Sequence, residues 1–188
     1  QVVHYILNPR FTDADLKWLQ DSKTTQDMSD DFLNYLRHFK FDGDIYAVPE
    51  GTPVFANEPL INITGQSIDV QMFETYLLSV MNFQTLIATK TARMVHAARG
   101  RTCFDFGARR AHGRDAGILA ARASFIGGVA GTSLVIAGKY FDIPYVGTLA
   151  HKFVQDRSCE LEAFRAYARS FPHNTMLLID TYDTVEGA

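Results

Sequence analysis

The chain has 188 residues, of which 47% are hydrophobic and 21% charged, so it can form a real core in one large domain or two small ones. No apolar run approaches the ~18 residues of a membrane span, and residues 1–7 lack the features of a signal peptide. Cys103 and Cys159 give neither a metal spacing nor a disulfide framework, which favours two buried thiols in a reducing compartment. We therefore expect a cytoplasmic protein that is neither membrane-bound nor disulfide-rich.

The net charge of −3 is unevenly distributed along the chain. Residues 1–80 carry 5 Lys/Arg against 12 Asp/Glu, whereas residues 81–188 carry 13 against 9. Basic side chains are densest from Lys90 to Arg122, and such a patch could attract a phosphorylated ligand or nucleic acid. A solvated helix face explains most of the patch better. Arg109 and Arg110 are exceptions, because they lie at a predicted strand end.

Residues 1–100 predict helices around a small antiparallel β-structure. The chain starts with helical character, as if inside a helix whose beginning lies upstream. Thr12 and Ser29 are candidate N-caps, each followed by acidic residues that the helix dipole favours. Apolar residues at helical spacing predict a long helix over 67–98. Between these helices, turn signals separate short strand-like runs at 45–48, 53–55 and 59–64.

From residue 102 onward, short apolar strands alternate with helices. The predicted strands are 102–106, 143–146 and 175–179, and the predicted helices are 117–125, 132–139 and 159–170. This alternation indicates an α/β fold with parallel strands and right-handed crossovers, either a doubly wound sheet or a β/α barrel. In both, functional loops lie at the carboxyl ends of the strands. About four strand–helix units are present, half of a barrel, so we expect a fragment or one part of an assembly.

The first of these strands runs into the sequence DFGARR at 105–110. Phe106 offers a face on which a flat heteroaromatic ring can stack, and Arg109 or Arg110 can bind phosphate or carboxylate. The alternative is a core phenylalanine and two surface arginines. Further on, Gly128 and Ser133 lie in a glycine-rich stretch near a helix start, where backbone N–H groups could bind an anion. A tight turn explains these glycines about as well.

His151 follows the predicted strand 143–146 in the sequence GTLAH. It could act as a general base, a metal ligand or a phosphoacceptor. Asp180 and Asp183, at the end of the next strand, could orient it, or could bind ribose hydroxyls or a Mg²⁺-bound diphosphate. A single histidine without a partner at metal-ligand spacing argues against a zinc site. The strand ends together indicate an active site without a protein-held metal.

In combination and order, these motifs resemble the nicotinate phosphoribosyltransferases, a family of type II phosphoribosyltransferases. The similar segments are 32–36, 50–60, 84–90, 106–111, 147–151 and 180–184. The resemblance implies transfer of the phosphoribosyl group of 5-phosphoribosyl-1-diphosphate to nicotinate, which gives nicotinate mononucleotide and diphosphate. It also implies ATP as a co-substrate with Mg²⁺, since ATP hydrolysis drives the reaction through transient phosphorylation of a histidine.

The resemblance also implies roles for individual residues. His151 takes the place of the phosphorylated histidine, Asp183 matches the carboxylate that hydrogen-bonds it, and Asp180 is a weaker match. Thr148 matches a threonine that contacts nicotinate, Phe106 the ring-stacking aromatic and Arg109 a substrate-binding arginine. With the residues singled out above, the expected substrate-binding set is Thr148, Phe106, Arg109, Arg110, Gly128 and Ser133.

The family fold is an α/β N-terminal domain followed by an irregular β/α barrel, and its dimers share active sites. We therefore expect residues 1–100 to be part of the N-terminal domain and residues 101–188 the first half of a TIM-like barrel. The resemblance implies a homodimer that binds nicotinate, 5-phosphoribosyl-1-diphosphate and ATP, but neither nucleic acid nor membrane. Because the family has further site residues before and after this stretch, the 188 residues alone should be inactive.

Two positions depart from the family pattern. Lys152 follows His151 where the family usually has serine, and Ala130 stands where many relatives have aspartate. Two alternatives remain open. One is a sister transferase acting on nicotinamide or quinolinate, and the other is a non-catalytic truncated paralogue whose basic patch binds phosphates or nucleic acid.

Overall fold

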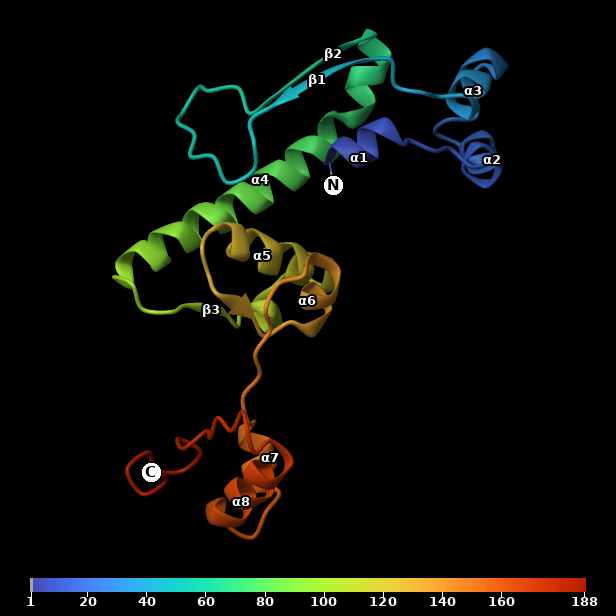
Figure 1. Ribbon diagram of the computed structural model, residues 1–188. Helices are drawn as coiled ribbons and strands as arrows, with labels where there is room; N and C mark the ends of the chain where they lie inside the picture. The colour runs from blue at the N-terminus through green and yellow to red at the C-terminus, as the bar shows by residue number, and fades with distance from the viewer. Residues whose placement is uncertain (1) are drawn as a thin grey trace.

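The computed structural model describes residues 2–188 and shows a mixed α/β chain (Figure 1). Its helices are α1 (Val2–Leu7), α2 (Asp13–Asp21), α3 (Asp30–Arg37), α4 (Ser67–Ala97), α5 (Arg114–Ile126), α6 (Val135–Phe141), α7 (His151–Gln155) and α8 (Glu160–Ser170), with a 3₁₀ turn η1 (Ala108–Arg110). Its strands are β1 (Gly43–Ala47), β2 (Ile61–Gly65), β3 (Phe104–Asp105) and β4 (Gly131–Thr132). The mixed α/β class predicted from the sequence is confirmed.

Helix α4, 31 residues long, connects the two halves of the structure (Figure 1). Its first half packs against α1 and the β1–β2 pair, and its second half packs against α5. β1 and β2 are antiparallel, with Gly43 opposite Gly65, as the turn signals predict. The apolar run 53–55 forms no strand and lies in the loop between them. The buried core of this half is Val2, Ile6, Phe41, Phe73 and Val80.

Helices α2 and α3 begin where the sequence places their caps. The Thr12 hydroxyl accepts the N–H of Asp15 at 3.2 Å, and the Asp15 carboxylate accepts the N–H of Thr12 at 2.8 Å, which completes a capping box. These bonds with Thr12 lower the pKa of Asp15. In α3 the Ser29 hydroxyl accepts the N–H of Phe32. The two helices bury Leu16, Leu33 and Leu36 between them.

The second half contains consecutive parallel segments, but they are shorter than predicted. β3 pairs with β4, and Thr132 of β4 forms a parallel bridge with Tyr145. The predicted strand 143–146 is reduced to this bridge, because Pro144 has no N–H to donate. The predicted strand 175–179 is wrong: it has no strand structure in the described chain, since no neighbouring segment pairs with it.

Helices α7 and α8 lie apart from α5 and α6, at the end of an extended stretch that follows α6 (Figure 1). They have a small core of their own, in which Leu149, Val154 and Ala163 are buried and Leu178 packs against them. The boundary predicted near residue 100 falls in the connection between α4 and β3. The division into domains at that point stays a prediction.

Helices α4 and α5 approach very closely at the end of α5. A Cβ at Gly127 would lie 2.7 Å from the carbonyl oxygen of Ala88 and 2.8 Å from the Cβ of Thr91. Both distances are shorter than a van der Waals contact. Next to them, the buried Thr91 hydroxyl donates to the Ser124 hydroxyl at 3.4 Å. A glycine at 127 is therefore required for the two helices to meet.

Gly127→Ala tests this contact. We expect the change to lower the free energy of unfolding by about 1–3 kcal/mol, because overpacking forces the two helices apart. Chemical denaturation measures the loss. The matched control is Gly117→Ala on the same helix, where the new Cβ would make an ordinary 3.7 Å contact with Ala111. Equal destabilisation by the two changes would contradict the close contact.

Arg122 of α5 joins four parts of the fold. Its guanidinium donates to Glu50 at 2.9 and 2.6 Å, in the loop after β1, and to Gln84 of α4 at 3.4 Å. It also lies 5.7 Å from the centre of the Phe141 ring at the end of α6. The hydrogen bond with Arg122 lowers the pKa of Glu50. The pair holds the loop between β1 and β2 against the second half of the chain.

Glu50→Gln tests how much the Glu50–Arg122 pair contributes to the free energy of unfolding, because this contribution depends on pH. At pH 7 we expect the free energy of unfolding to fall by about 1 kcal/mol, a value discounted because Glu50 is largely exposed. Since the folded-state pKa of Glu50 is lowered from 4.5, the stabilisation is complete above that pH and is lost as the pH falls through the folded-state value. Denaturation at pH 7 and at about pH 3 measures it. Glu74→Gln, at an exposed position of α4, is the control. A loss that is the same at both pH values would refute the pairing.

Candidate active site

The parallel register brings two of the predicted strand ends, those of 102–106 and 143–146, to one edge together with β4, which was not predicted as a strand. Asp105 pairs with Thr132, and Thr132 bridges to Tyr145. Because the three segments run in the same direction, the residues that follow them emerge side by side. Phe106 and Ser133 therefore belong to the same edge, and Thr148 follows the bridged Tyr145 by three residues, on the stretch that leads to α7. We call these three residues, with Arg109 and Arg110, the strand-end group.

Asp105 and Thr132 form the base of the strand-end group. Thr132 is fully buried, and its hydroxyl donates to Asp105 Oδ2 at 3.0 Å. Asp105 Oδ1 accepts the N–H of Gly107 at 2.9 Å, and the carbonyl oxygen of Asp105 accepts the N–H of Ser133 at 2.8 Å. These bonds fix the turn after β3. Sequence reasoning gave Asp105 no role of its own and took Thr132 as a possible helix cap, although an aspartate two residues before a glycine is a recognisable turn signal.

The turn leaves Phe106 and the two arginines open to solvent. Phe106 is 43% exposed, so it is not the core residue of the alternative interpretation. Arg109 and Arg110 are exposed on η1, directly after it, and form no ion pair within residues 2–188. An exposed ring next to two unpaired guanidinium groups suits a flat ligand that also carries negative charge.

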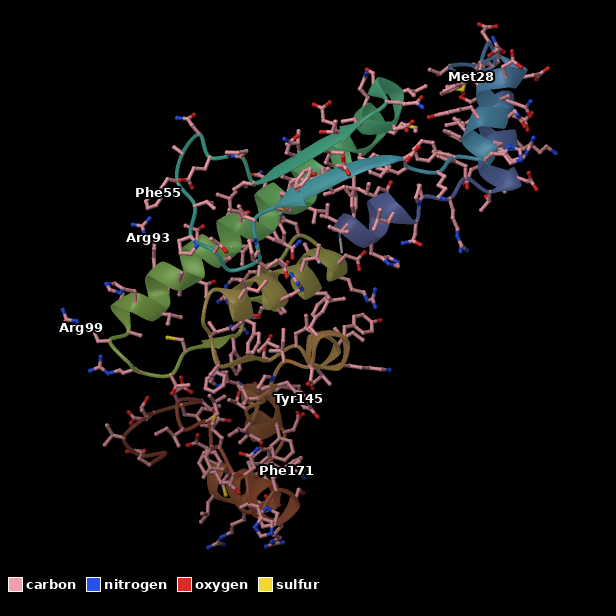
Figure 2. All side chains as sticks on the ribbon, turned by 45° about the horizontal axis from the view of Figure 1, so that its top comes forward. Met28, Phe55, Arg93, Arg99, Tyr145 and Phe171 are labelled. Carbon is pink, nitrogen blue, oxygen red and sulfur yellow. The ribbon has the colours of Figure 1, made fainter. Side chains whose placement is uncertain are left out.

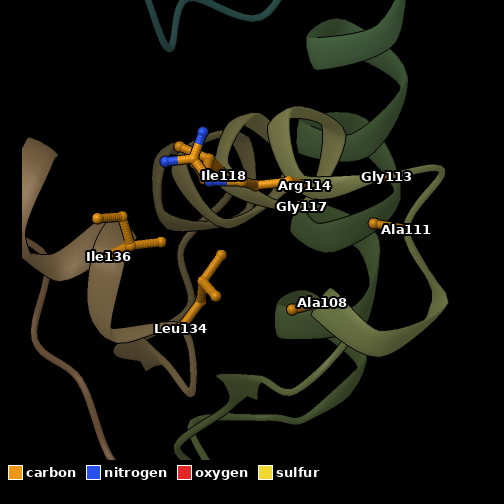
Figure 3. A pocket seen from close by; sticks show the side chains of 8 residues that line it. All are labelled: Ala108, Ala111, Gly113, Arg114, Gly117, Ile118, Leu134 and Ile136. Atoms are coloured by element: carbon orange, nitrogen blue, oxygen red, sulfur yellow. The ribbon is translucent and has the colours of Figure 1, made fainter.

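A groove of about 240 Å³ lies beside the strand-end group, between η1, α5 and α6 (Figure 3). Ala108, Gly117, Ile118, Leu134 and Ile136 make its lining mostly apolar. Arg114 at the rim lies within 3.2 Å of Asp115. The groove adds apolar surface beside η1, and Arg114 is the charged side chain of its lining.

Gly128 differs from its predicted setting. It does not precede a helix but follows α5, with a φ of +105° that favours glycine. Its N–H donates to the carbonyl oxygen of Phe125 at 3.0 Å. The tight-turn interpretation therefore fits Gly128 better than the anion-binding one, because the amide already has an acceptor.

His151 is the first residue of α7 and is exposed. Its Nδ1 lies 3.2 Å from the hydroxyl oxygen of Thr181, and its Nε2 lies 4.0 Å from Asp180 Oδ1. Residues 180 and 181 thus reach His151 although no strand precedes them. Thr181 was missed by sequence reasoning, since a threonine hydroxyl has no distinctive signal in a sequence. No hydrogen bond or ion pair in the described chain joins His151 to the strand-end group.

Asp183 forms no hydrogen bond or ion pair with His151 in the described chain, and the role that the family pattern gives it stays a prediction. Its Oδ1 accepts the N–H groups of Val185 at 2.8 Å and of Glu186 at 3.1 Å. Its carbonyl oxygen accepts the N–H of Gly187 at 2.9 Å. Asp183 therefore closes the turn that follows Asp180, and Asp180 is the carboxylate next to the histidine.

Lys152 is directed to Asp156, one helical turn away on α7. Its charge is therefore paired within the helix, next to His151. Ala130, the other departure from the family pattern, is exposed in the turn before β4.

Much of the basic stretch from Lys90 to Arg122 is a solvated surface. Arg93 and Arg99 project outward from the end of α4 (Figure 2). Arg122 is bound to Glu50, as described above. The interpretation of this stretch as mainly a solvated helix face is consistent with these positions.

The two cysteines are free thiols, but they are not both buried as predicted. Cys103 is half-buried and Cys159 is exposed. Among residues 2–188, no three histidine, cysteine or acidic side chains are arranged to hold a metal ion. The helices of this stretch also lack the combination of length and apolar character needed to cross a membrane.

The fold and the site define an α/β protein with short consecutive parallel segments. An exposed aromatic ring and two arginines follow the first of these segments, and a histidine follows the last. Residues 1–82 match the family model described as the nicotinate phosphoribosyltransferase N-terminal domain. The chain is 46% identical over 186 residues to a nicotinate phosphoribosyltransferase of Mycobacterium tuberculosis, an alignment that covers 99% of this chain and 39% of that protein. It is 43% identical over 187 residues to the nicotinate phosphoribosyltransferase of Bacillus subtilis, with 100% and 37% covered.

The crystal structure of human nicotinic acid phosphoribosyltransferase is similar in fold. It superposes with a TM-score of 0.84 at 28% identity, over 97% of this chain and 46% of the human one. These matches confirm the resemblance: the chain is a relative of the nicotinate phosphoribosyltransferases. It spans about two fifths of the length of the curated relatives it matches.

The new role of Asp183 can be tested by amide hydrogen exchange. Asp183→Ala removes the acceptor of two amides, so we expect exchange at Val185 and Glu186 to become about tenfold faster. Asp183→Asn keeps an oxygen acceptor and should retain most of the protection. Asp180→Ala is the matched control and should leave both amides protected. Unchanged exchange in Asp183→Ala would show that this carboxylate does not shape the turn.

Proposed function

We propose that the protein carrying this chain transfers the phosphoribosyl group of 5-phosphoribosyl-1-diphosphate to nicotinate, in the synthesis of NAD. One observation carries the proposal. In a chain that aligns with nicotinate phosphoribosyltransferases over 99% of its length, the parallel register brings Phe106 and Ser133 to one edge, near two arginines that form no ion pair in the described chain. This edge offers a stacking face, hydroxyl groups and positive charge, which a pyridine carboxylate and a phosphorylated ribose both require.

The strand-end group would bind the substrates. The exposed ring of Phe106 stacks on the pyridine ring, and the Thr148 hydroxyl contacts nicotinate. Arg109 and Arg110 bind phosphate or carboxylate oxygens. During transfer the ring nitrogen of nicotinate bonds to the anomeric carbon, and diphosphate leaves with the electron pair of the broken C–O bond. Fixed positive charge at the leaving diphosphate lowers the barrier, since negative charge develops there.

His151 would couple this transfer to ATP. It takes the γ-phosphoryl group of ATP, while the bond from the γ-phosphorus to the β–γ bridging oxygen breaks and ADP leaves with the electron pair. Hydrolysis of the resulting phosphohistidine makes nucleotide formation favourable. The Asp180 carboxylate, 4.0 Å from Nε2, offsets the positive charge that the ring acquires. The exposed position of His151 at the start of α7 gives a nucleotide access to the ring.

Mg²⁺ is assigned to the substrates in this proposal. The ion accompanies the phosphates of ATP and of 5-phosphoribosyl-1-diphosphate, where it offsets their charge. No side chain of the described residues is assigned to hold it.

We also propose an assembly. Residues 101–188 would begin a β/α barrel, of which β3, β4 and the bridge at Tyr145 are the first parallel segments. The active protein would be a cytoplasmic homodimer with shared active sites. Since further site residues are expected outside this stretch, the 188 residues alone would be inactive.

The decisive experiment measures nucleotide formation by the protein that carries this chain, with and without ATP. With nicotinate, we expect ATP to stimulate product formation. His151→Ala should lower the rate with ATP to the rate without it, because the phosphoryl group has no acceptor. His173→Ala, which replaces an exposed histidine with no assigned role, is the control and should keep the stimulation.

The same assay separates the alternatives. Turnover of nicotinamide or quinolinate in preference to nicotinate would identify a sister transferase. No binding of 5-phosphoribosyl-1-diphosphate, together with salt-sensitive nucleic-acid binding, would favour the non-catalytic paralogue. Stimulation by ATP that survives in His151→Ala would refute the role given to this histidine.

A further inference from the structure

Thr132 of β4 forms hydrogen bonds with the segments on both of its sides. Its N–H donates to the carbonyl oxygen of Pro144 at 3.0 Å, and its carbonyl oxygen accepts the N–H of Val146 at 2.9 Å. Its hydroxyl donates to Asp105 Oδ2 of β3 at 3.0 Å. The same hydroxyl oxygen accepts the N–H of Leu134 at 3.1 Å. A single residue therefore links the segment of Pro144 and Val146 to β3.

The Asp105 carboxylate extends this link to the turn that carries Phe106. Its Oδ2 accepts the Thr132 hydroxyl and its Oδ1 accepts the N–H of Gly107 at 2.9 Å, so each oxygen has one donor. One donor lies on β4 and the other lies in the turn after β3. Because β3 and β4 are only two residues long, few backbone bonds join them, and the carboxylate is a large part of their connection. Without the Thr132 hydroxyl, both the carboxylate and the Gly107 amide would be less fixed.

The bonds of Thr132 are buried, whereas the groups that they would align are exposed. Thr132 is fully buried, so water does not replace its partners. Phe106 is 43% exposed, and Thr148, two residues after Val146, is also exposed. Exposed side chains have few packing contacts to hold their backbone in place. The relative position of the two segments therefore depends on the buried bonds at Thr132.

We propose that Thr132 and Asp105 are positioning residues, which hold the Phe106 turn and the segment that leads to Thr148 in one fixed register for phosphoribosyl transfer. This inference rests on the proposed function, in which both segments bind substrate. Thr132 acts on one side through its backbone bonds and on the other side through the Asp105 carboxylate. Both residues thus act through the strand-end group, and neither needs to touch a substrate.

Phosphoribosyl transfer requires a fixed distance between its two substrates. The lone pair of the nicotinate ring nitrogen forms the bond to the anomeric carbon, while the C–O bond to diphosphate breaks and diphosphate leaves with the electron pair. Before the transfer, the reacting atoms must lie in line and about 3–3.5 Å apart. A shift of the Phe106 turn relative to the neighbouring segment would change this alignment but leave each substrate its own contacts. Loss of the link should therefore slow the chemical step more than it weakens the binding of either substrate.

The first arm of the test needs no substrate and measures amide hydrogen exchange in the protein that carries this chain. Thr132→Val removes the hydroxyl, so the Leu134 amide loses its acceptor and the Asp105 carboxylate loses a donor. We expect exchange to become about three- to tenfold faster at Leu134 and, through the carboxylate, at Gly107. Thr132→Ser should restore both rates. Unchanged exchange at Gly107 in Thr132→Val would overturn the proposal.

Two further variants separate positioning from a general loss of structure. Thr91→Val is the matched control, because it removes another buried hydroxyl, which lies on α4 and bonds to Ser124. It should leave exchange at Gly107 unchanged. Asp105→Asn keeps the size of the side chain but offers one oxygen to two donors. It therefore breaks the same network from the β3 side, even if Thr132→Val does not fold.

The second arm follows a single turnover of nicotinate and 5-phosphoribosyl-1-diphosphate. Thr132→Val and Asp105→Asn should each slow nucleotide formation about tenfold and change the Kd of either substrate less than about twofold. Thr132→Ser should recover most of the rate, and Thr91→Val should keep it. An unchanged rate in Thr132→Val and Asp105→Asn, or a loss confined to substrate affinity, would overturn the proposal. If the unaltered protein forms no nucleotide, the proposed function fails, and exchange at Gly107 still decides whether Thr132 holds the Phe106 turn.

Discussion

The parallel register of three short segments is the constraint on which the strand-end group depends. Asp105 lies opposite Thr132, and Thr132 lies opposite Tyr145. These two pairings determine which side chains emerge together at the carboxyl edge. A slip of one residue would turn every side chain to the other face. The buried Thr132 hydroxyl donates to the Asp105 carboxylate, so a side-chain bond adds to the backbone pairing. The exposed ring of Phe106 and its neighbouring arginines follow from this register.

The histidine is held by a different force. Burial of Leu149, Val154 and Leu178 in one cluster brings His151 and Thr181 together without any strand pairing. The chain thus carries the proposed binding groups on a hydrogen-bonded edge and His151, the proposed phosphoacceptor, on an apolar cluster, joined by the segment that contains Thr148. In the proposed function, these separate anchors would let substrate binding and phosphoryl transfer use different surfaces of one site.

The sequence predicted the features that local chemistry decides. The caps of α2 and α3 and the antiparallel pair agree with the structure, since the caps depend on neighbours in the chain and the pair on turn signals between its strands. Long-range features were harder. A strand at 175–179 needs a partner that an apolar run cannot reveal, and the setting of Gly128 depends on where α5 ends. The motif at 180–184 offered two carboxylates, and only the turn closed by Asp183 shows that Asp180 is the one near the histidine.

We propose that consecutive strand ends form one binding site for a pyridine nucleotide. The most direct test is a crystal structure of the protein that carries this chain with nicotinate mononucleotide bound. We predict the pyridine ring against Phe106, the phosphate within hydrogen-bond distance of Arg109 or Arg110, and the carboxylate near Thr148. A nucleotide bound elsewhere, with these four side chains still open to solvent, would contradict the account.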